Sequence, residues 1–280
     1  MGGVRIFLAL VLALGCVGAP ALADDMRTLA REKAAAVSIM REKAAKQICI
    51  LAQDRVFGAY LTATTQGEGV RRKRRIEAAF ATINTRFGLR EVTLIARDGV
   101  VVAHVAKGAH AVSGEFNLVK DTMLMAGFAL DAMNVSTLVV ANGDKAGYAI
   151  SHVTPVAWHG DKEFVLRGEQ DMGAYKAVLA SGVGEGRYVA LIDETRSILS
   201  DAGTNPGAQG VSAKLSVAGF SFDGIRRAVK GSADAGSGEI ALANKRFNVG
   251  YQSLGRWTIV AVEAAAPPRR CASDGARLCG

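Results

Sequence analysis

The sequence predicts an α+β protein in which a long N-terminal helix precedes two tandem modules, each an antiparallel sheet of about five strands with helices. The main observation is an internal repeat, since Val92–His104 and Val189–Asp201 align without a gap at a constant offset of 97 residues. In both copies an apolar run rich in β-branched residues meets a short polar break and resumes, which is typical of a strand, a tight turn and a strand. A repeat of this length predicts a duplicated small domain.

Residues 1–23 have the composition of a secretory signal peptide. Arg5 supplies the positive start, residues 6–14 the apolar core, and Ala21-Leu22-Ala23 the small-residue cleavage site. The apolar run ends at Pro20 and is shorter than the about 20 residues that a membrane span needs. We therefore expect export to the periplasm and cleavage after Ala23, with a lipoprotein processing site at Cys16 as the alternative.

Residues 24–62 are predicted to form the long helix, because they contain no proline and no glycine before Gly58. Apolar residues recur on one face at spacings of 3, 4, 4 and 3, at Val37, Met40, Ala44, Ile48 and Leu51. The stripe indicates either a spine for the modules or the seam of a homodimer, and both alternatives are open at this point.

Five basic residues, Arg71–Arg75, begin a second amphipathic helix that ends at Gly88. The formal net charge of the chain is +8, and such a run is one mark of nucleic-acid binding. No aromatic residue is interleaved with it as a stacking platform requires, and export separates the protein from nucleic acid. A solvated helix face or a weak contact with an anionic membrane surface is expected instead.

The remaining elements repeat in the order helix, hairpin, helix and three strands. The first module is assigned to 63–171 and the second to 172–264, followed by a flexible tail at 265–280. Asn142-Gly143-Asp144 is a strong turn signal in the first module. This order predicts a five-stranded antiparallel sheet in each module with its helices on one face.

Four segments in this order resemble the double Cache, PAS-like, extracellular sensor domains of bacterial receptors. They are a strand ending in Ser151–Val156, the Phe164–Asp171 strand that leads into a helix, the Tyr188–Ser200 hairpin, and the closing hairpin Val249–Ala261 with its Gly-x-Trp. The resemblance runs from about Asp24 to Ala264. It implies a membrane-distal-type first module, a membrane-proximal-type second module, and binding of a small solute.

The resemblance and strand alternation together suggest a ligand site at Tyr148, His152, Arg167 and Asp171. Asp171 occupies the place of the family's acidic ligand contact. Alternate strand residues share a face, so Tyr148 lies with His152 and Arg167 with Asp171. If the polar positions of both strands face the helix-covered side, all four line one pocket. The alternative is a structural ion pair between Arg167 and Asp171.

Two departures from the resembled family change the expected partners. Receptor domains of this kind usually continue into a membrane helix, whereas here Val262 is followed only by a short tail. A separate membrane receptor, kinase or cyclase is therefore the expected signalling partner. The Arg-x-Trp-Tyr run of the amino-acid-binding members is absent from Val119–Met125, so amino-acid sensing by that route is not expected.

Catalytic and metal-binding patterns do not emerge from the sequence. The four histidines show no metal-ligand spacing, and no nucleophile and base can be paired, so neither an enzyme nor a cofactor is predicted. A protein-binding scaffold without a small ligand is one alternative, and a periplasmic hydrolase or metalloprotein is another. Cys271 and Cys279 are a candidate disulfide in an oxidising compartment, and Cys49 is expected to be a buried apolar residue.

Overall fold

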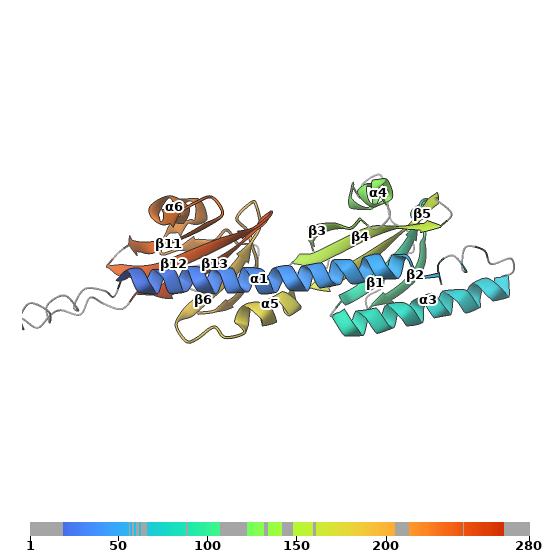
Figure 1. The fold of residues 1–280 in the computed structure, drawn as a ribbon, viewed down its shortest axis with the longest axis horizontal. Helices are drawn as coiled ribbons and strands as arrows, with labels where there is room; N and C mark the ends of the chain where they lie inside the picture. The colour runs from blue at the N-terminus through green and yellow to red at the C-terminus, as the bar shows by residue number, and fades with distance from the viewer. Residues whose placement is uncertain are drawn as a thin grey trace, which may run out of the picture. The chain divides into compact units, whose positions relative to one another are not determined.

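The computed structural model describes residues 19–55, 57, 59, 62, 66–87, 89–106, 122–131, 134–141, 148–158, 161–204, 213–242 and 244–265. The chain divides into two compact units (Figure 1). The first module is residues 35–181, and the second module combines residues up to 34 with those from 182 onward. Helix α1 (Ala19–Ala52) contributes to both. Cys16, Cys271, Cys279 and the Asn142–Asp144 turn lie outside the described residues.

The first module contains a five-stranded antiparallel sheet, as the sequence predicts. Its elements are α3 (Gln66–Phe87), β1 (Leu89–Ala96), β2 (Val101–Ala106), α4 (Thr122–Ala129), β3 (Ser136–Ala141), β4 (Tyr148–Trp158), β5 (Asp161–Asp171) and α5 (Met172–Ala180). The strand order is β2-β1-β5-β4-β3. Because α5 packs on β4 and β5, the first module extends to Ser181 rather than ending at Asp171.

Helices cover both faces of this sheet, so the prediction of helices on one face is wrong. A Cβ added to Gly168 of β5 would lie 2.4 Å from Ile48 of α1. A Cβ added to Gly127 of α4 would lie 2.3 Å from Val153 of β4. Residues 153 and 168 point to opposite faces, since Val153 pairs with Arg167. We call these the α1 face and the α4 face.

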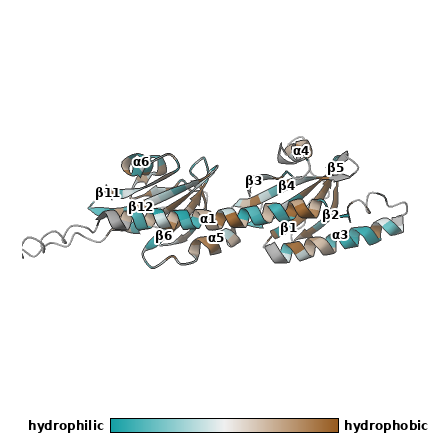
Figure 2. Ribbon diagram, viewed as in Figure 1, coloured by the Kyte–Doolittle hydropathy of each residue, from teal (hydrophilic) through white to brown (hydrophobic). Residues whose placement is uncertain are grey.

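The apolar stripe of α1 belongs to the core of the first module. Ala44, Ile48 and Leu51 are buried there with Phe80 of α3. This burial within the chain favours the spine over the homodimer seam. The helix ends at Ala52, before the predicted Thr62. The backbone N–H groups of Gln53 and Asp54 donate to the carbonyls of Ile50 and Leu51, three residues earlier, which closes a tighter turn at the helix end. Figure 2 shows the mixed hydropathy of α1 and the hydrophilic start of α3.

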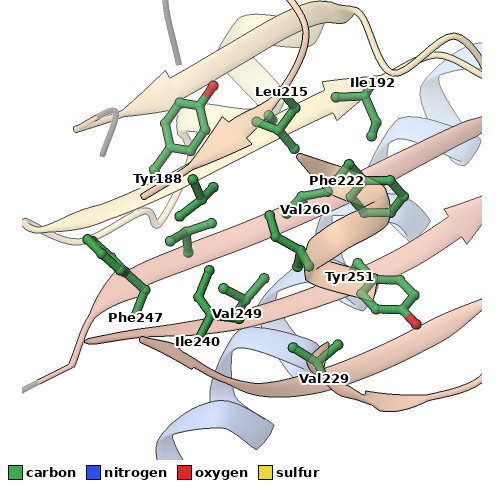
Figure 3. Close-up of a cluster of buried hydrophobic side chains, with 14 of the residues drawn as sticks. Tyr188, Ile192, Leu215, Phe222, Val229, Ile240, Phe247, Val249, Tyr251 and Val260 are labelled. Atoms are coloured by element: carbon green, nitrogen blue, oxygen red, sulfur yellow. The ribbon is translucent and has the colours of Figure 1, made fainter. Parts of the chain in front are cut away.

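The second module has a six-stranded antiparallel sheet in the order β10-β11-β12-β13-β6-β7. Its elements are β6 (Arg187–Ile192), β7 (Ile198–Gly203), β8 (Ser216–Val217), β9 (Phe220–Ser221), α6 (Phe222–Ala228), β10 (Lys230–Gly231), β11 (Ala235–Leu242), β12 (Lys245–Leu254) and β13 (Trp257–Ala264). Figure 3 shows its core, where Phe222 packs edge-on against Tyr251 with ring centroids 5.6 Å apart.

The start of α1 covers the face of the second sheet that points away from the core with Phe222 and Tyr251. A Cβ added to Gly250 of β12 would lie 2.2 Å from the backbone nitrogen of Arg27 and 2.3 Å from the backbone carbon of Met26. Only glycine permits this close approach of helix and strand backbones. The Ser237 hydroxyl also donates to the Asp24 carboxylate at 3.1 Å.

The two hairpins of the sequence repeat are equivalent in structure. The β1–β2 ladder shifts register between Leu94 and Ile95, and the β6–β7 ladder shifts between Leu191 and Ile192. Both irregularities fall at the same aligned step, which confirms that the repeated sequence encodes a repeated structure. Strands β2 and β7 each lie at a sheet edge.

Among the described residues, no helix combines the length and apolar character needed to cross a membrane.

Candidate functional site

The register of β4 with β5 separates the four predicted site residues into two pairs. Val153 lies opposite Arg167, and His152 lies opposite Gly168. Directly opposed residues share a face of an antiparallel sheet. Tyr148 and His152 therefore lie on the α1 face, whereas Arg167 and Asp171 lie on the α4 face. The expectation that all four line one pocket is corrected by this register.

His152 belongs to a buried hydrogen-bonded network on the α1 face. Its Nδ1 is 2.9 Å from the Thr137 hydroxyl and its Nε2 is 3.1 Å from Oε1 of Gln170. The Tyr175 hydroxyl donates to the same Gln170 oxygen at 2.6 Å. Because Oε1 of Gln170 can only accept, Nε2 of His152 carries the proton and Nδ1 accepts from the Thr137 hydroxyl. Both ring nitrogens are thus used within the chain.

Burial lowers the pKa of His152 to about 4, and the Arg41 charge acts in the same direction while the Gln170 hydrogen bond opposes it. Burial likewise raises the pKa of Tyr175. Both groups are therefore neutral at pH 7, and the network joins β3, β4, β5 and α5.

Two other predicted site residues, Tyr148 and Asp171, lie at the ends of their strands. Tyr148 is half-buried at the start of β4. Asp171 is the exposed N-cap of α5 and accepts from the Gly173 N–H at 2.7 Å.

Arg167 lies within a group of polar side chains on the α4 face, which we call the polar cluster. Cross-strand pairing sets Glu91, Glu169 and Ser151 in one row. The next row contains His104, Thr93 and Arg167. Arg90 joins them from the register irregularity between Leu89 and Glu91, where an extra residue in one strand redirects its side chain. The cluster is Arg90, Glu91, Thr93, His104, Ser151, Arg167 and Glu169.

Glu169 is the centre of the cluster and is 2 % exposed. Its Oε2 accepts from Nη2 of Arg90 at 2.8 Å and from Nε of Arg90 at 3.1 Å, and its Oε1 forms an ion pair with Nη2 of Arg167. Nε of Arg167 donates to the buried Ser151 hydroxyl at 3.2 Å. Two guanidinium groups therefore hold one buried carboxylate, which lets all three charges remain in the interior.

His104 and Glu91 lie at the other side of the polar cluster. The Thr93 hydroxyl donates to Oε1 of Glu91 at 2.9 Å, and Nε2 of His104 is 4.0 Å from the same oxygen. Burial lowers the pKa of His104, although Glu91 and then Glu77 act to raise it, so the imidazole is neutral at pH 7. Its buried Nε2 has no hydrogen-bond partner among the described residues. A buried polar atom of this kind is costly unless a further group binds it.

Apolar residues form the next row of the α4 face. Ile95, Val165 and Pro155 pair across β1, β5 and β4, and Gly127 of α4 approaches Val165. The Arg97 guanidinium lies 5.6 Å from the ring centroid of Phe128 on the same helix. The face thus changes from charged to apolar along the strands. Two arginines and two glutamates balance the charge of the polar cluster.

Sequence reasoning identified Arg167 but missed the rest of the polar cluster. The signal lay in strand alternation, because Glu91 and Thr93 interrupt an apolar run at every second residue. Ser151 and Glu169 occupy the matching positions on β4 and β5. In the described ranges no three histidine, cysteine, aspartate or glutamate side chains gather as a metal site. His110 and His159 lie outside those ranges.

No protein-family model and no curated protein matches this sequence. Solved structures do match it in fold. The sensory domain of the Campylobacter jejuni chemoreceptor Tlp3 with isoleucine bound matches with a TM-score of 0.64 at 12% identity, over 94% of this chain and 98% of that one. The sensor domain of the Vibrio cholerae histidine kinase DctB matches with a TM-score of 0.60 at 13% identity, over 88% and 98%.

The ligand-binding domain of the Pseudomonas aeruginosa amino acid chemoreceptor PctC, in complex with GABA, matches with a TM-score of 0.58 at 14% identity, over 86% of this chain and 99% of that one. The chain therefore has the fold of bacterial chemoreceptor and histidine-kinase sensor domains. This fold agrees with the resemblance of the sequence to double Cache sensor domains.

Proposed function

We propose that this chain is a periplasmic double Cache sensor that binds a small polar solute at the polar cluster of the first module. The observation that supports this proposal most directly is the buried arginine-bound Glu169, set beside an unpartnered His104 nitrogen and an apolar row. Charged groups in a water-poor environment bind polar ligand groups strongly when they are held in place beforehand.

The cluster chemistry suits a solute with both acidic and basic or hydrogen-bonding groups. Arg167 and Ser151 can donate to a ligand carboxylate, and Glu91 can accept from a ligand amine. Nε2 of His104 lies next to Glu91 and offers a further polar contact. Ile95 and Val165 provide an apolar surface for the body of the ligand. A compact zwitterionic or carboxylate-bearing solute meets all these requirements.

We further propose that the chain is exported and cleaved after Ala23, so that the mature protein begins at Asp24. Asp24 is the residue that accepts the hydrogen bond from Ser237 of β11, and cleavage at this point keeps that attachment of α1. A separate membrane receptor, kinase or cyclase would receive the signal. N-terminal sequencing of periplasmic protein tests the export step, and a lipid-modified Cys16 or an uncleaved start would contradict it.

A thermal-shift screen of small carboxylates, amines and amino acids tests the site. A solute at a hundred times its dissociation constant stabilises the folded state by about 2.7 kcal/mol, which shifts the melting temperature by roughly 5–10 °C. Arg167→Gln should abolish the shift. Arg187→Gln is the matched control, because Arg187 is also half-buried and pairs with Glu263 at 3.1 Å in the second module.

The control should keep the full shift. An equal shift in the parent and in Arg167→Gln would place the solute elsewhere. If no solute stabilises the parent, the polar cluster has a structural role and the protein-binding scaffold becomes the better explanation.

A further inference from the structure

The start of helix α3 contains a strongly cationic hollow that solute binding at the polar cluster does not use. Its volume is about 410 Å³, and its described lining is Glu68, Arg71, Arg72, Arg74 and Arg75. Four guanidinium groups therefore surround the space against a single carboxylate. Like charges gathered around a concavity repel one another, and a single carboxylate offsets only part of that repulsion.

Arg72 is held in position within this hollow. It forms an ion pair with Glu68, one helical turn earlier, and its Nη1 donates to the Thr62 hydroxyl at 3.3 Å. Arg71, Arg74 and Arg75 are exposed and form no ion pair with any residue in the described ranges. One fixed guanidinium and three adaptable ones thus line the same space.

The position of the charges is unfavourable for the helix itself. Arg71 is three residues from Arg74 and four from Arg75, and like charges at these spacings repel on a helix surface. A bound anion would reduce this repulsion.

The first turn of α3 leaves room for a ligand. A Cβ added at Gly67 or at Gly69 would meet no atom within 4 Å. Open space therefore adjoins the cationic side chains. Arginine is well suited to phosphate, since its planar fork donates two parallel hydrogen bonds to a pair of phosphate oxygens.

We propose that this hollow is a second ligand site, which binds a small soluble anion carrying several phosphate groups. Its volume falls in the range of small-molecule pockets and exceeds the needs of one phosphate, while the number of guanidinium groups fits several. A concave site of this kind receives a discrete molecule, whereas a planar bilayer surface cannot enter it.

Isothermal titration calorimetry with tripolyphosphate tests the proposal. The triple variant Arg71→Gln, Arg74→Gln, Arg75→Gln should bind about tenfold or more weakly than the parent, since three charge contacts are lost. The matched control is Arg226→Gln, Arg227→Gln, Lys230→Gln, which removes the same charge from exposed positions in the second module. The control should bind within about twofold of the parent.

Equal weakening in both triple variants would show attraction by net charge alone and would overturn the proposal. Absence of tripolyphosphate binding to the parent would overturn it too. If the parent instead cosediments with phosphatidylglycerol vesicles, the site recognises a membrane surface rather than a small anion.

Glutamine keeps a helix propensity close to that of arginine, so circular dichroism should show a folded triple variant. A second triple variant, with lysine in place of the same three arginines, retains the charge but removes the fork geometry. It should bind more weakly than the parent and more tightly than the glutamine variant. Affinity equal to that of the glutamine variant would contradict the charge contribution.

Discussion

Gly99 and Arg196 occupy equivalent turn positions in the two repeated hairpins, and both have positive φ angles, of 92° and 69°. Glycine adopts this conformation without cost, whereas a residue with a Cβ is disfavoured there. Arg196 is held by its side chain, whose guanidinium lies 5.2 Å from the Phe222 ring centroid and donates to Asp223 at 3.3 Å. The same turn conformation is therefore stabilised in two ways, by a glycine in the first hairpin and by the side-chain contacts of Arg196 in the second.

Gly99→Ala should lower the free energy of unfolding by about 1–2 kcal/mol, the cost of a left-handed conformation for an L residue. Urea denaturation followed by circular dichroism measures this change. Gly184→Ala is the control, because Gly184 has no positive φ and an added Cβ would meet no atom within 4 Å. A loss of the same size in the control would remove the turn as the cause.

Ile192→Asp should unfold the second module. Ile192 is fully buried in the core of that module, in the same cluster as Leu215 and Phe222 (Figure 3). An unpaired carboxylate there costs several kcal/mol, which is comparable with the total stability of a small domain. Loss of near-ultraviolet circular dichroism and a lower melting temperature should result. If this variant melts like the parent, the assignment of Ile192 to the core is incorrect.

Gly250→Ala should destabilise the contact between α1 and β12, because the new methyl group overlaps the backbone at Met26 and Arg27. Overpacking of this kind costs about 1–3 kcal/mol. Limited proteolysis should then cut the start of α1 faster than in the parent. Gly67→Ala, whose methyl group meets open space, should leave the cleavage rate unchanged.

Stability should fall as the pH drops from about 6.5 to about 4. The folded-state pKa of His152 is lowered to about 4, whereas an unfolded histidine has a pKa of about 6.5. The unfolded chain therefore binds the proton first in this window, and protonation favours unfolding by up to roughly 3 kcal/mol. The stability that neutral His152 contributes is complete above pH 6.5.

His152→Gln removes this titration. Its melting temperature should depend less steeply on pH between 4 and 6.5 than that of the parent. The lowered pKa of His104 acts in the same direction, so a residual slope should remain. Identical slopes in the parent and the variant would contradict the burial of a neutral His152.

The fold was predictable because its signals are local. The apolar spacing from Val37 to Leu51 and the period of two in the hairpins follow from the geometry of helix and strand. The repeat then required the two hairpins to match. The site was harder to predict, because it depends on the register between β4 and β5.

A register slip of one residue moves a side chain to the opposite face, and the sequence of Tyr148 to Asp171 does not show which residues oppose each other. His152 was consequently placed with Arg167. Three of the side chains that accompany Arg167 come from β1, 74 to 77 residues earlier in the chain, namely Arg90, Glu91 and Thr93. Long-range pairing of this kind follows from tertiary packing rather than from any local pattern.

The division of α1 between two modules has a consequence for the order of folding during synthesis. The first module is one continuous stretch and can form as soon as residue 181 has been made. The second module needs the first part of α1 together with β12 and β13, which are among the last strands to be synthesised. Met26 is buried in the finished protein and lies against Gly250 of β12, so the strand that covers it is not available until synthesis is nearly complete.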